Sequence, residues 1–353
     1  IAKANEINPN ASKREMDMLL TIGEQMSVSL MAMVMHKLGV PAVSLNAFQV
    51  TMHTTSSHQN ARLKRIDTER IRRELDARRI VIVTGFQGVD KYDDYTTLGR
   101  GGSDTTAVAL AAALHADACE IYTDVDGVYT ADPRKVPNAR KLKEITYDEM
   151  LDLATSGAGV LHNRSVEMAK KYGVPLVVRS SLNNSEGTVV KEVVSVERML
   201  ISGVALDTDA VRIAVLGLRD VPGVAFKVFD TLAKKNINVD VILQSIGRAG
   251  TKDISFTVNK DDLDEAVATL EEHQERLGFK ELHSERNIAK LSIVGSGMLS
   301  NPGVAAKMFE SLYNEGVNIN MISTSEIRIT VLINEKDGIR AMNAVHDAFG
   351  LAD

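Results

Sequence analysis

The chain has 353 residues, of which 44% are hydrophobic and 25% are charged, and its formal net charge is −6. This length is sufficient for two or three domains that each have a core. The absence of a basic excess argues against a nucleic-acid-binding protein, because a phosphate backbone is met by clustered lysine and arginine.

The numbers and spacing of cysteines and histidines argue against disulfide bonds and dedicated metal sites. Its one cysteine, Cys119, excludes a disulfide framework and a multi-thiolate metal site. Cys119 lies in an apolar run before an expected strand, so we expect a small buried residue. The eight histidines show no metal-ligand spacing, so no dedicated metal site is expected.

The first half of the chain alternates helical patterns with short apolar strands. We expect helices at 14–38, 68–77, from Ser103 onward and at 161–172, and strands at 40–45, 80–83, 120–123 and 176–179. Thr146 and Glu149 have the spacing of a capping box at a further helix start. The alternation predicts an α/β domain with a mostly parallel sheet covered by helices. Ligands of such sheets sit at the carboxyl ends of the strands.

The long N-terminal helix carries a carboxylate on an apolar stripe. Leu20, Glu24, Val28 and Met31 share this stripe, and a buried carboxylate needs a partner. Either Arg100 or a ligand ammonium pairs with Glu24, or Glu24 lies at the edge of the stripe in water. We expect the methionines of this helix to pack in the core. No apolar run reaches the ~18 residues of a membrane span, so a cytoplasmic protein without a membrane partner is expected.

A glycine-rich stretch precedes the helix that starts at Ser103. Gly99, Gly101 and Gly102 bracket Arg100, and Asp104 follows in the first turn. Glycines let backbone N–H groups approach an anion, and the helix dipole and the guanidinium add positive charge. Asp104 could hold magnesium or orient a phosphoryl group. The alternative is an ordinary turn capped by Ser103, with an acid favoured by the helix dipole.

A second polar cluster covers residues 122–134. It combines a hydroxyl and a carboxylate at a strand end, Thr123 and Asp124, with an aromatic ring, Tyr129, and a cation, Arg134. A nucleotide site uses these residue types for base, ribose and phosphate. The alternative is a loop whose aspartates cap turns and in which Arg134 pairs with Asp132.

The second half of the chain contains a repeat. Eight residues recur 80 positions later: Pro222, Gly223, Lys227, Phe229, Leu232, Asn238, Ile242 and Ser245. Two copies are too few for a solenoid, so we expect a pair of small α+β domains. The expected domains are 1–190, 205–280 and 285–353, and the last strand or helix of the third is a candidate to return to the second.

The chain resembles the aspartokinase family over essentially its whole length. The resemblance rests on residues 19–25, 85–88, 97–104 and 122–134, is extended by 159–162 and 178–181, and the repeats resemble ACT domains, with 322–328 typical of the second. It implies an amino-acid-kinase fold that uses Mg-ATP to phosphorylate the side-chain carboxylate of L-aspartate. The product would be 4-phospho-L-aspartate, on the route to lysine and threonine.

The resemblance also assigns roles to individual positions. Glu24 would contact the substrate ammonium, and Arg100, with Gly101, Gly102 and Ser103, would hold the α-carboxylate, while Asp104 organises phosphoryl transfer beside Arg100. The implied ATP-binding residues are Ser103, Thr123, Asp124, Tyr129, Thr130, Asp132, Pro133 and Arg134.

The repeats are assigned to feedback control by lysine, threonine or both. Asp220, Pro222, Gly223, Ala225 and Gln244 match the threonine pattern, and Asn320, Ser323, Thr324 and Ser325 match the lysine-associated region. A Pro-Gly turn opens a helix whose free N–H groups can accept a ligand carboxylate. Alternatively, the same residues only end strands and cap helices. Effectors of related enzymes bind between ACT units, often across a dimer interface, so a homodimer or larger assembly is expected.

Two departures from the family pattern matter. Aspartokinases begin with a strand and a Lys-Phe-Gly-Gly-Thr-Ser loop that binds the transferred phosphates, whereas this sequence opens at Ile1 in a helical pattern. We therefore expect that an N-terminal piece is absent and that these residues alone have little kinase activity. Asn163 replaces a usual proline and is expected to alter a helix start. The remaining alternatives are a non-catalytic amino-acid-binding regulator and another enzyme of the amino-acid-kinase family.

Overall fold

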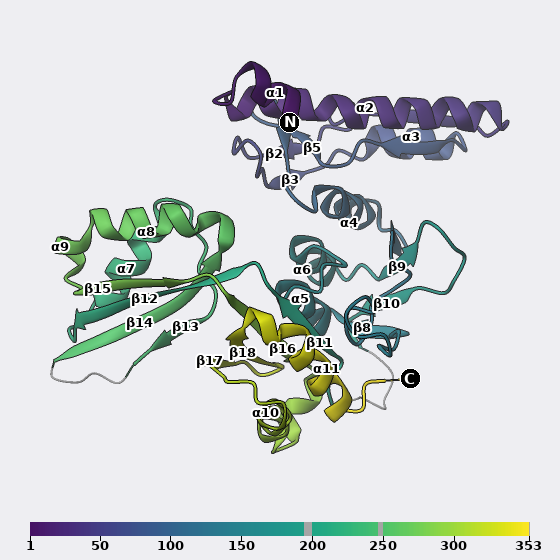
Figure 1. Ribbon diagram of the computed structural model, residues 1–353. Helices are drawn as coiled ribbons and strands as arrows, with labels where there is room; N and C mark the ends of the chain where they lie inside the picture. Colours follow the sequence, from purple (N-terminus) through teal and green to yellow (C-terminus); the bar gives the residue numbers. More distant parts are fainter. Residues whose placement is uncertain (194–199, 246–249, 353) are drawn as a thin grey trace. The chain divides into compact units, whose positions relative to one another are not determined.

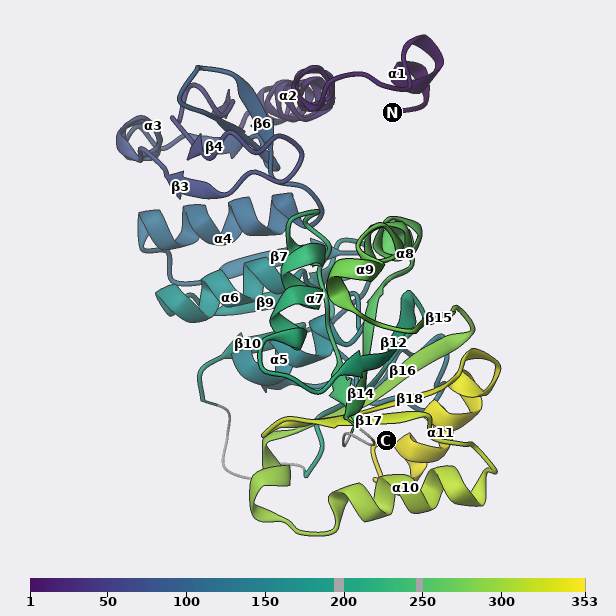
Figure 2. The same cartoon turned by 90° about the vertical axis from the view of Figure 1, so that its left-hand side faces the viewer.

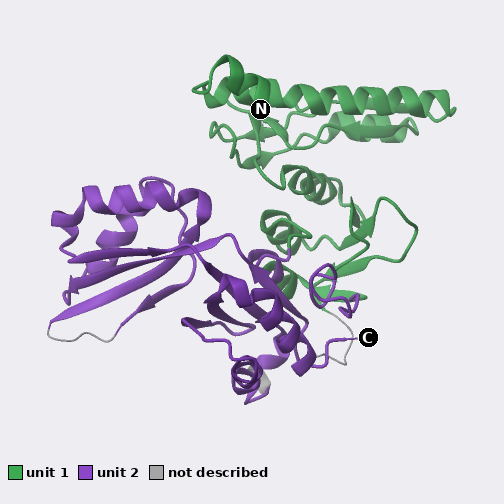
Figure 3. Cartoon of the chain, in the orientation of Figure 1, with its two compact units in different colours: residues 1–128, 143–151, 159–194 green, residues 129–142, 152–158, 195–353 purple. Residues whose placement is uncertain are grey.

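The structure is a computed structural model that describes residues 1–193, 200–245 and 250–352, so Asp353, the end of the third expected domain, lies outside the described residues. It divides into two compact units (Figure 1, Figure 3). The first comprises Ile1–Val128, Lys143–Leu151 and Gly159–Val194, and the second comprises Tyr129–Leu142, Asp152–Ala158 and Ser195–Asp353. The chain therefore passes between the units several times.

The first unit alternates strands and helices as predicted. Its helices are α1 (Ala2–Ile7), α2 (Lys13–Lys37), α3 (Glu69–Asp76), α4 (Gly102–Leu114), α5 (Tyr147–Thr155, which ends in the second unit) and α6 (Asn163–Tyr172). Its strands are β1 (Ala42–Leu45), β2 (His53–Thr54), β3 (Leu63–Arg65), β4 (Ile80–Val83), β5 (Gln87–Val89), β6 (Tyr95–Thr97), β7 (Cys119–Thr123), β8 (Glu144–Thr146), β9 (Leu176–Ser180) and β10 (Thr188–Lys191). The predicted capping box is confirmed, since Glu149 N–H donates to the Thr146 hydroxyl and that hydroxyl donates to the Glu149 carboxylate.

Parallel pairing places strand ends together in this unit. β1 pairs in parallel with β4, β7 pairs in parallel with β9, and β10 pairs in parallel with β8. Antiparallel pairs join β9 to β10, β2 to β3 and β5 to β6. A parallel pair of β2 with β5 completes the small sheet β3-β2-β5-β6. α4 and α6 lie side by side in both views (Figure 1, Figure 2). The register Thr123↔Ser180 brings the carboxyl ends of β7 and β9 to one edge.

Helix α2 differs from expectation in two ways. Met18, Met26, Met31 and Met33 are 45–63% exposed, so the prediction that the methionines pack in the core is wrong for these four. The reason is that α2 packs on one side only, against β1, β4 and β6.

The same helix is long and apolar enough to cross a membrane when judged by length and composition alone, contrary to the expectation from the sequence. Its buried face nevertheless carries Asp17 and Thr21, and Asp17 accepts hydrogen bonds from the sheet through Thr97. Such polar bonds attach α2 to its own unit.

The second unit contains two four-stranded sheets with helices. Its strands are β11 (Gly203–Asp207), β12 (Ala210–Arg219), β13 (Ile242–Gln244), β14 (Thr251–Asn259), β15 (Glu281–Glu285), β16 (Ile288–Val294), β17 (Met321–Thr324) and β18 (Arg328–Asn334). Its helices are α7 (Val224–Ala233), α8 (Leu263–Glu272), α9 (Gln274–Leu277), α10 (Val304–Asn314) and α11 (Gly338–Ala348), with short 3-10 turns η1 (Lys260–Asp262), η2 (Ser296–Ser300) and η3 (Glu335–Asp337).

Strand pairing corrects the expected domain limits. The first-repeat sheet has the order β13-β14-β12-β15, and the second-repeat sheet has the order β11-β16-β18-β17. β11 precedes the first repeat in the chain but pairs with β16 from Gly203↔Val294 to Asp207↔Lys290. The expectation that an end of the last domain returns to the first repeat is therefore wrong, because the exchanged strand is β11.

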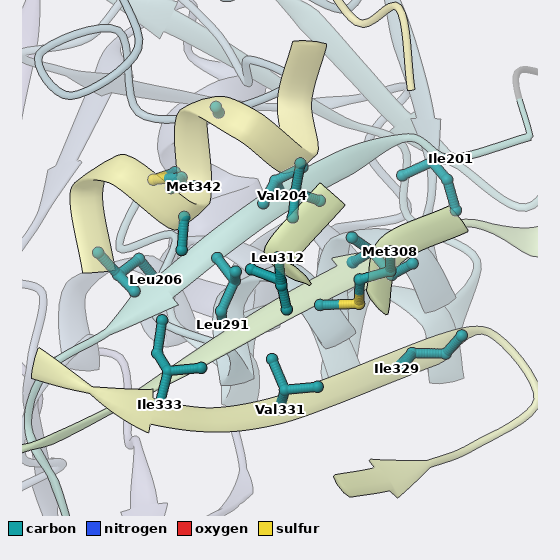
Figure 4. Packing of buried hydrophobic residues seen from close by; sticks show 14 of the residues in the cluster. Ile201, Val204, Leu206, Leu291, Met308, Leu312, Ile329, Val331, Ile333 and Met342 are labelled. Carbon is teal, nitrogen blue, oxygen red and sulfur yellow. The ribbon is translucent and has the colours of Figure 1, made fainter. Parts of the chain in front are cut away.

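Each repeat has its own core on the helix-covered face of its sheet. In the first repeat, Phe256, Val228 and Leu270 are fully buried. In the second, Leu291, Leu312 and Val331 are fully buried between the sheet, α10 and α11 (Figure 4). The second core also takes Ala131, Val136 and Ala139 from the loop that follows β7, which ties this loop to the second repeat.

The repeats share their helix-start geometry. Gly223 and Gly303 are the N-caps of α7 and α10, with φ of 87° and 94°, a left-handed conformation that favours glycine. The side chains of Asn259 and Asn334 accept N–H bonds at the starts of η1 and η3. The repeat seen in the sequence is thus a repeat of local structure.

Candidate functional site

The glycine-rich stretch forms a tight turn at the start of α4. Gly99 and Gly101 have φ of 79° and 66°. A side chain at Gly101 would come within 2.2 Å of His162 Cβ, and one at Gly102 within 2.8 Å of the Phe86 ring. Gly101 is the N-cap, and no side chain caps the helix, so the alternative of a turn capped by Ser103 is not what forms. The first-turn N–H groups therefore lack a side-chain cap.

Arg100 is exposed on this turn, and within the described part of the chain no acidic side chain pairs with its guanidinium. A cavity of about 630 Å³ adjoins it, lined among others by Leu20, Gln59, Phe86, Thr97, Gly99 and Arg100. An unpaired guanidinium beside a cavity is suited to a carboxylate or phosphate.

Asp104 lies behind the turn and interacts with the start of α6. It is half-buried, and burial raises the pKa of its carboxyl group, while the His162 backbone N–H and the His162 charge oppose this. Burial lowers the pKa of His162, and Arg164 lowers it further. Cys119 is buried as predicted, and burial raises the pKa of its thiol to about 11, with the charge of Asp104 adding to the effect.

Arg164 of α6 holds the backbone before the glycine turn in place. Its guanidinium donates to the carbonyl oxygens of Leu98 at 2.6 Å and Ala61 at 3.0 Å. Asn163 is the first residue of α6, and His162 caps that helix through its ring nitrogen. The Arg164 contact with Leu98 holds the chain two residues before Arg100 in place.

The structure also identifies a buried carboxylate that sequence reasoning missed. Asp17 on α2 is fully buried and accepts hydrogen bonds from Thr97 N–H, the Thr97 hydroxyl and Gln59 N–H, and His58 Nδ1 lies at 2.9 Å. Glu24, seven residues later on the same stripe, is half-buried. The spacing of seven was a usable signal, because it puts both carboxylates on one helix face.

The expected nucleotide residues fall into two groups. Thr123 ends β7 in the first unit and Asp124 follows it. The Thr123 hydroxyl donates to Asp124 at 3.1 Å, and the Thr123 carbonyl accepts from the Ser181 N–H. Asp124 is exposed at this strand end. These two side chains therefore meet the expectation of polar groups at the carboxyl end of a strand.

The remaining members belong to the second unit. Arg134 is exposed and forms a two-bond pair with Asp132 at 3.0 Å, which lowers the pKa of that carboxyl group. Pro133 is exposed and Tyr129 is half-buried. The pair is the one that the alternative interpretation of this loop predicted.

Thr130 does not fit the nucleotide role implied by the resemblance. It is fully buried, and its hydroxyl donates to the Leu351 carbonyl and lies 2.9 Å from His346 Nε2. Thr130 thus has no exposed atom to offer a nucleotide. Its contacts join the loop to α11 and the residues after it.

The effector residues expected in the first repeat come together around a cavity of about 280 Å³. Its lining includes Asp220, Pro222, Gly223, Ala225 and Gln244, together with Lys252, which the sequence did not single out. Lys252 Nζ lies 2.6 Å from Asp220 Oδ1.

The residues expected in the second repeat lie along β17, at the edge of its sheet. Asn320, Thr324 and Ser325 are exposed and Ser323 is half-buried. The Ser325 N–H donates to the Arg328 carbonyl, and Asn318 donates to the Asn320 side chain at 3.3 Å. Over residues 1–193, 200–245 and 250–352, no group of three or more histidine, cysteine, aspartate or glutamate side chains is placed to hold a metal ion.

Comparison with protein families agrees with this division. Residues 1–180 match the amino acid kinase family, and residues 213–274 and 291–349 match an ACT domain family. α2, Arg100 and Asp104 fall in the first match, and the first-repeat cavity falls in the second.

Comparison with individual proteins points the same way. The chain is 52% identical over 351 residues to an aspartokinase of Geobacillus stearothermophilus and 50% identical over 350 residues to one of Bacillus sp. MGA3, and in each case 99% of the chain covers 85% of the relative. Among solved structures, Escherichia coli aspartokinase III in complex with aspartate and ADP gives a TM-score of 0.82 at 29% identity, with 96% of this chain and 76% of that chain covered. The chain belongs to the aspartokinase family.

Proposed function

We propose that the chain transfers the terminal phosphoryl group of ATP to the side-chain carboxylate of L-aspartate. The observation that carries the proposal is Arg100, an exposed guanidinium on a glycine turn at the uncapped start of α4. The family supports it, since the E. coli relative was solved with aspartate and ADP. An arginine fork beside the backbone N–H groups of a helix start without a side-chain cap is complementary to the α-carboxylate of an amino acid.

In this proposal the substrate is held at three points. Arg100 and the backbone N–H groups of Gly101 and Ser103 bind the α-carboxylate, and Glu24 binds the ammonium. The Gly102 N–H holds the turn itself, because it donates to the Gly99 carbonyl at 3.1 Å. A side-chain carboxylate oxygen then attacks the terminal phosphorus, the bond from that phosphorus to the bridging oxygen breaks, and ADP leaves. Such a transfer depends on positioning and charge stabilisation, with little covalent chemistry for the protein.

Asp104 has a positioning role in this scheme. Its carboxyl group is held by the backbone of His162, and His162 in turn packs against Gly101. The position of the turn is therefore coupled to Asp104 through a single residue.

ATP would be bound by the members of the predicted set that lie in the first unit, at the start of α4 and at the carboxyl end of β7. These are Ser103 and Asp124, which are exposed, and Thr123, which is half-buried. Tyr129, Asp132, Pro133 and Arg134 of the predicted set belong to the second unit. Thr130 instead fixes the loop. Mg²⁺ would arrive on the phosphates and keep several waters, so one exposed carboxylate such as Asp124 suffices and no three-ligand protein cage is required.

The ACT repeats would make the activity responsive to end-product amino acids. E. coli aspartokinase III has also been solved with lysine and aspartate, with a TM-score of 0.74 to this chain at 29% identity, 96% of this chain and 76% of that chain covered. We assign threonine to the first repeat and lysine to the second, and a homodimer in the cytoplasm as the working state.

Arg100→Met tests the catalytic proposal in an assay that couples ADP release to NADH oxidation. Loss of charge-assisted hydrogen bonds should raise KM for aspartate about 100-fold, with KM for ATP little changed. Arg100→Lys should keep part of the affinity, because it keeps the charge but not the fork.

Arg286→Met is the matched control, because Arg286 is an exposed arginine in the second unit that pairs with Asp264. It should leave both KM values unchanged. An unaltered KM for aspartate in Arg100→Met would remove Arg100 from the site. Aspartate-independent ADP release by the unaltered chain would contradict the proposed reaction.

A further inference from the structure

The cavity of the first repeat contains an ion pair at its wall. Lys252 extends from β14 and Asp220 lies between β12 and α7, with 2.6 Å between Nζ and Oδ1. The two side chains are 14% and 46% exposed, so water reaches the carboxylate more readily than the ammonium. A partly solvated pair of this kind can exchange one partner for a ligand group at modest cost.

A third electrostatic element is the start of α7, which has ten residues. Gly223 is its N-cap, no side chain caps it, and Ala225 of its first turn lines the cavity. The cavity thus has a carboxylate, an ammonium and uncapped N–H groups within one wall. Gln244 adds a side-chain amide that can donate or accept.

These charges match an amino acid zwitterion. The ligand ammonium can replace Lys252 on Asp220, while the ligand carboxylate binds the α7 N–H groups and the released Lys252 ammonium. The charged side chains sum to zero, so a ligand with a neutral side chain leaves the cavity balanced. A cationic side chain would add a second positive charge beside Lys252 and α7.

We infer that Lys252 sets the charge selectivity of this cavity, so that it accepts amino acids with uncharged side chains and rejects cationic ones. The inference rests on the proposed effector role of the first repeat. It adds a residue that the sequence pattern did not include, and it explains why this repeat would take threonine in preference to lysine.

The second repeat provides an internal comparison. Eighty residues after Asp220 the chain has Ser300. The position that corresponds to Lys252 is Ile327, just before β18, because the Ser245 N–H donates to the Asp253 carbonyl as the Ser325 N–H donates to the Arg328 carbonyl. The same scaffold therefore forms without either charge. The ion pair is a property of the first cavity and is not a requirement of the fold.

Isothermal titration of the full chain tests the inference with L-threonine and with L-2,4-diaminobutyrate, which is similar in size and cationic at neutral pH. Lys252→Met should weaken threonine about tenfold, through loss of a charged hydrogen-bond partner, and should strengthen diaminobutyrate. The preference for threonine should fall by more than about 30-fold. Lys252→Arg should keep the preference of the unaltered chain.

Asp220→Asn changes the charge of the cavity in the opposite direction from Lys252→Met. It therefore tests the inference even if the Lys252→Met variant does not fold. It leaves the cavity with excess positive charge, so threonine should weaken and L-glutamate should gain. Lys234→Met is the matched control, because Lys234 makes a 2.7 Å pair with Asp230 on α7 outside the cavity. It should change neither affinity.

The outcomes separate the two proposals. Threonine binding with an unchanged threonine-to-diaminobutyrate ratio in Lys252→Met would overturn the role of Lys252 and leave the effector site standing. Failure of every ligand to bind the unaltered chain would overturn both. If Lys252→Met and Asp220→Asn lowered the affinities for all ligands by the same factor, the preference between ligands would be unchanged. The ion pair would then have only a structural role, and the inference would be overturned.

Discussion

The two ACT repeats build the same scaffold but use their lysines differently. In the first, Lys252 faces one carboxylate at the wall of a cavity. In the second, Lys290 on β16 is 7% exposed and lies between Asp207 at 2.9 Å and Asp240 at 2.6 Å. Burial lowers the pKa of Lys290, but the two carboxylates outweigh burial and the net pKa is raised.

This difference indicates that the two lysines have different roles. An ion pair that water reaches can exchange partners, whereas a buried cation must keep the partners it has. Lys290 connects β16 and β11 with Asp240, which belongs to the first repeat, and so holds the exchanged strand and both repeats together. The second repeat also holds α5 through Arg328 and Asp152. We infer that Lys252 serves ligand exchange in the first repeat, whereas Lys290 serves the attachment of the second repeat to its neighbours.

Of the two lysine substitutions, removal of Lys290 should have the larger effect on stability. Lys290→Met leaves two carboxylates beside a buried apolar side chain and should lower the free energy of unfolding by about 3–5 kcal/mol. Lys252→Met should lower it by about 1 kcal/mol or less. Urea titration followed by circular dichroism measures both free energies of unfolding. Equal losses of stability would contradict the different roles of the two lysines.

Truncation of the equivalent core residues compares the two cores directly. Phe256 pairs with Ile242 on β13 as Val331 pairs with Ile322 on β17, and both are fully buried. Phe256→Ala should cost about 3–5 kcal/mol, and Val331→Ala about 2 kcal/mol, because fewer buried carbons are lost. The measurement is again urea unfolding, and a larger loss for Val331→Ala would show that the second core is the more sensitive.

The pH dependence of stability should distinguish the repeats through His346. Burial lowers the pKa of His346, although Asp347 opposes this. The unfolded chain therefore binds a proton that the folded chain does not, so the free energy of unfolding should fall as pH drops below about 6.5. The position in the first repeat that corresponds to His346 is Glu271, which is exposed and has no such burial.

His346→Gln removes the titrating group but keeps an amide able to bond the Thr130 hydroxyl. The difference in urea midpoint between pH 7 and pH 5 should be smaller in this variant than in the unaltered chain. Glu271→Gln is the control and should leave that difference nearly as it is. If the His346→Gln variant kept the whole difference in urea midpoint between pH 7 and pH 5, other titrating groups would be responsible for that difference.

Removal of the shared caps should give the smallest and most even effects. Asn259→Ala and Asn334→Ala each remove one side-chain acceptor for an N–H group, at 3.0 and 3.2 Å, and each should cost about 1 kcal/mol. Thermal unfolding of both variants in the same buffer measures the two losses of stability. A clear inequality would show that the local starts of η1 and η3 are not equivalent.

Local and repeated features could be predicted from the sequence. The alternation of strands and helices, the Thr146–Glu149 box and the two repeats depend on residues close in the chain, and the structure confirms them. The five residues that were expected to bind an effector in the first repeat also gather around one cavity. Their clustering follows from the Pro-Gly turn and the end of β13, which the pattern located.

Long-range pairings could not be predicted in the same way. A repeat aligns copies but does not state which strand each sheet recruits, so the move of β11 to β16 was not visible. The pairing of Lys252 with Asp220 spans 32 residues, and Thr130 meets His346 across 216 residues. The exposed methionines of α2 were misassigned because periodicity shows which residues share a face, not whether the fold covers it.

The packing of the loop after β7 affects how the molecule can be dissected. Ala131, Val136 and Ala139 complete the core of the second repeat, Asn343 donates to the Lys135 carbonyl, and Ala139 bridges to Ala352. A fragment that starts after residue 194 would thus expose an apolar patch, and the N-terminal fragment would keep a loop without its support. The regulatory half is not a contiguous cassette, and a chimera that exchanges it must carry residues 129–142 along with it.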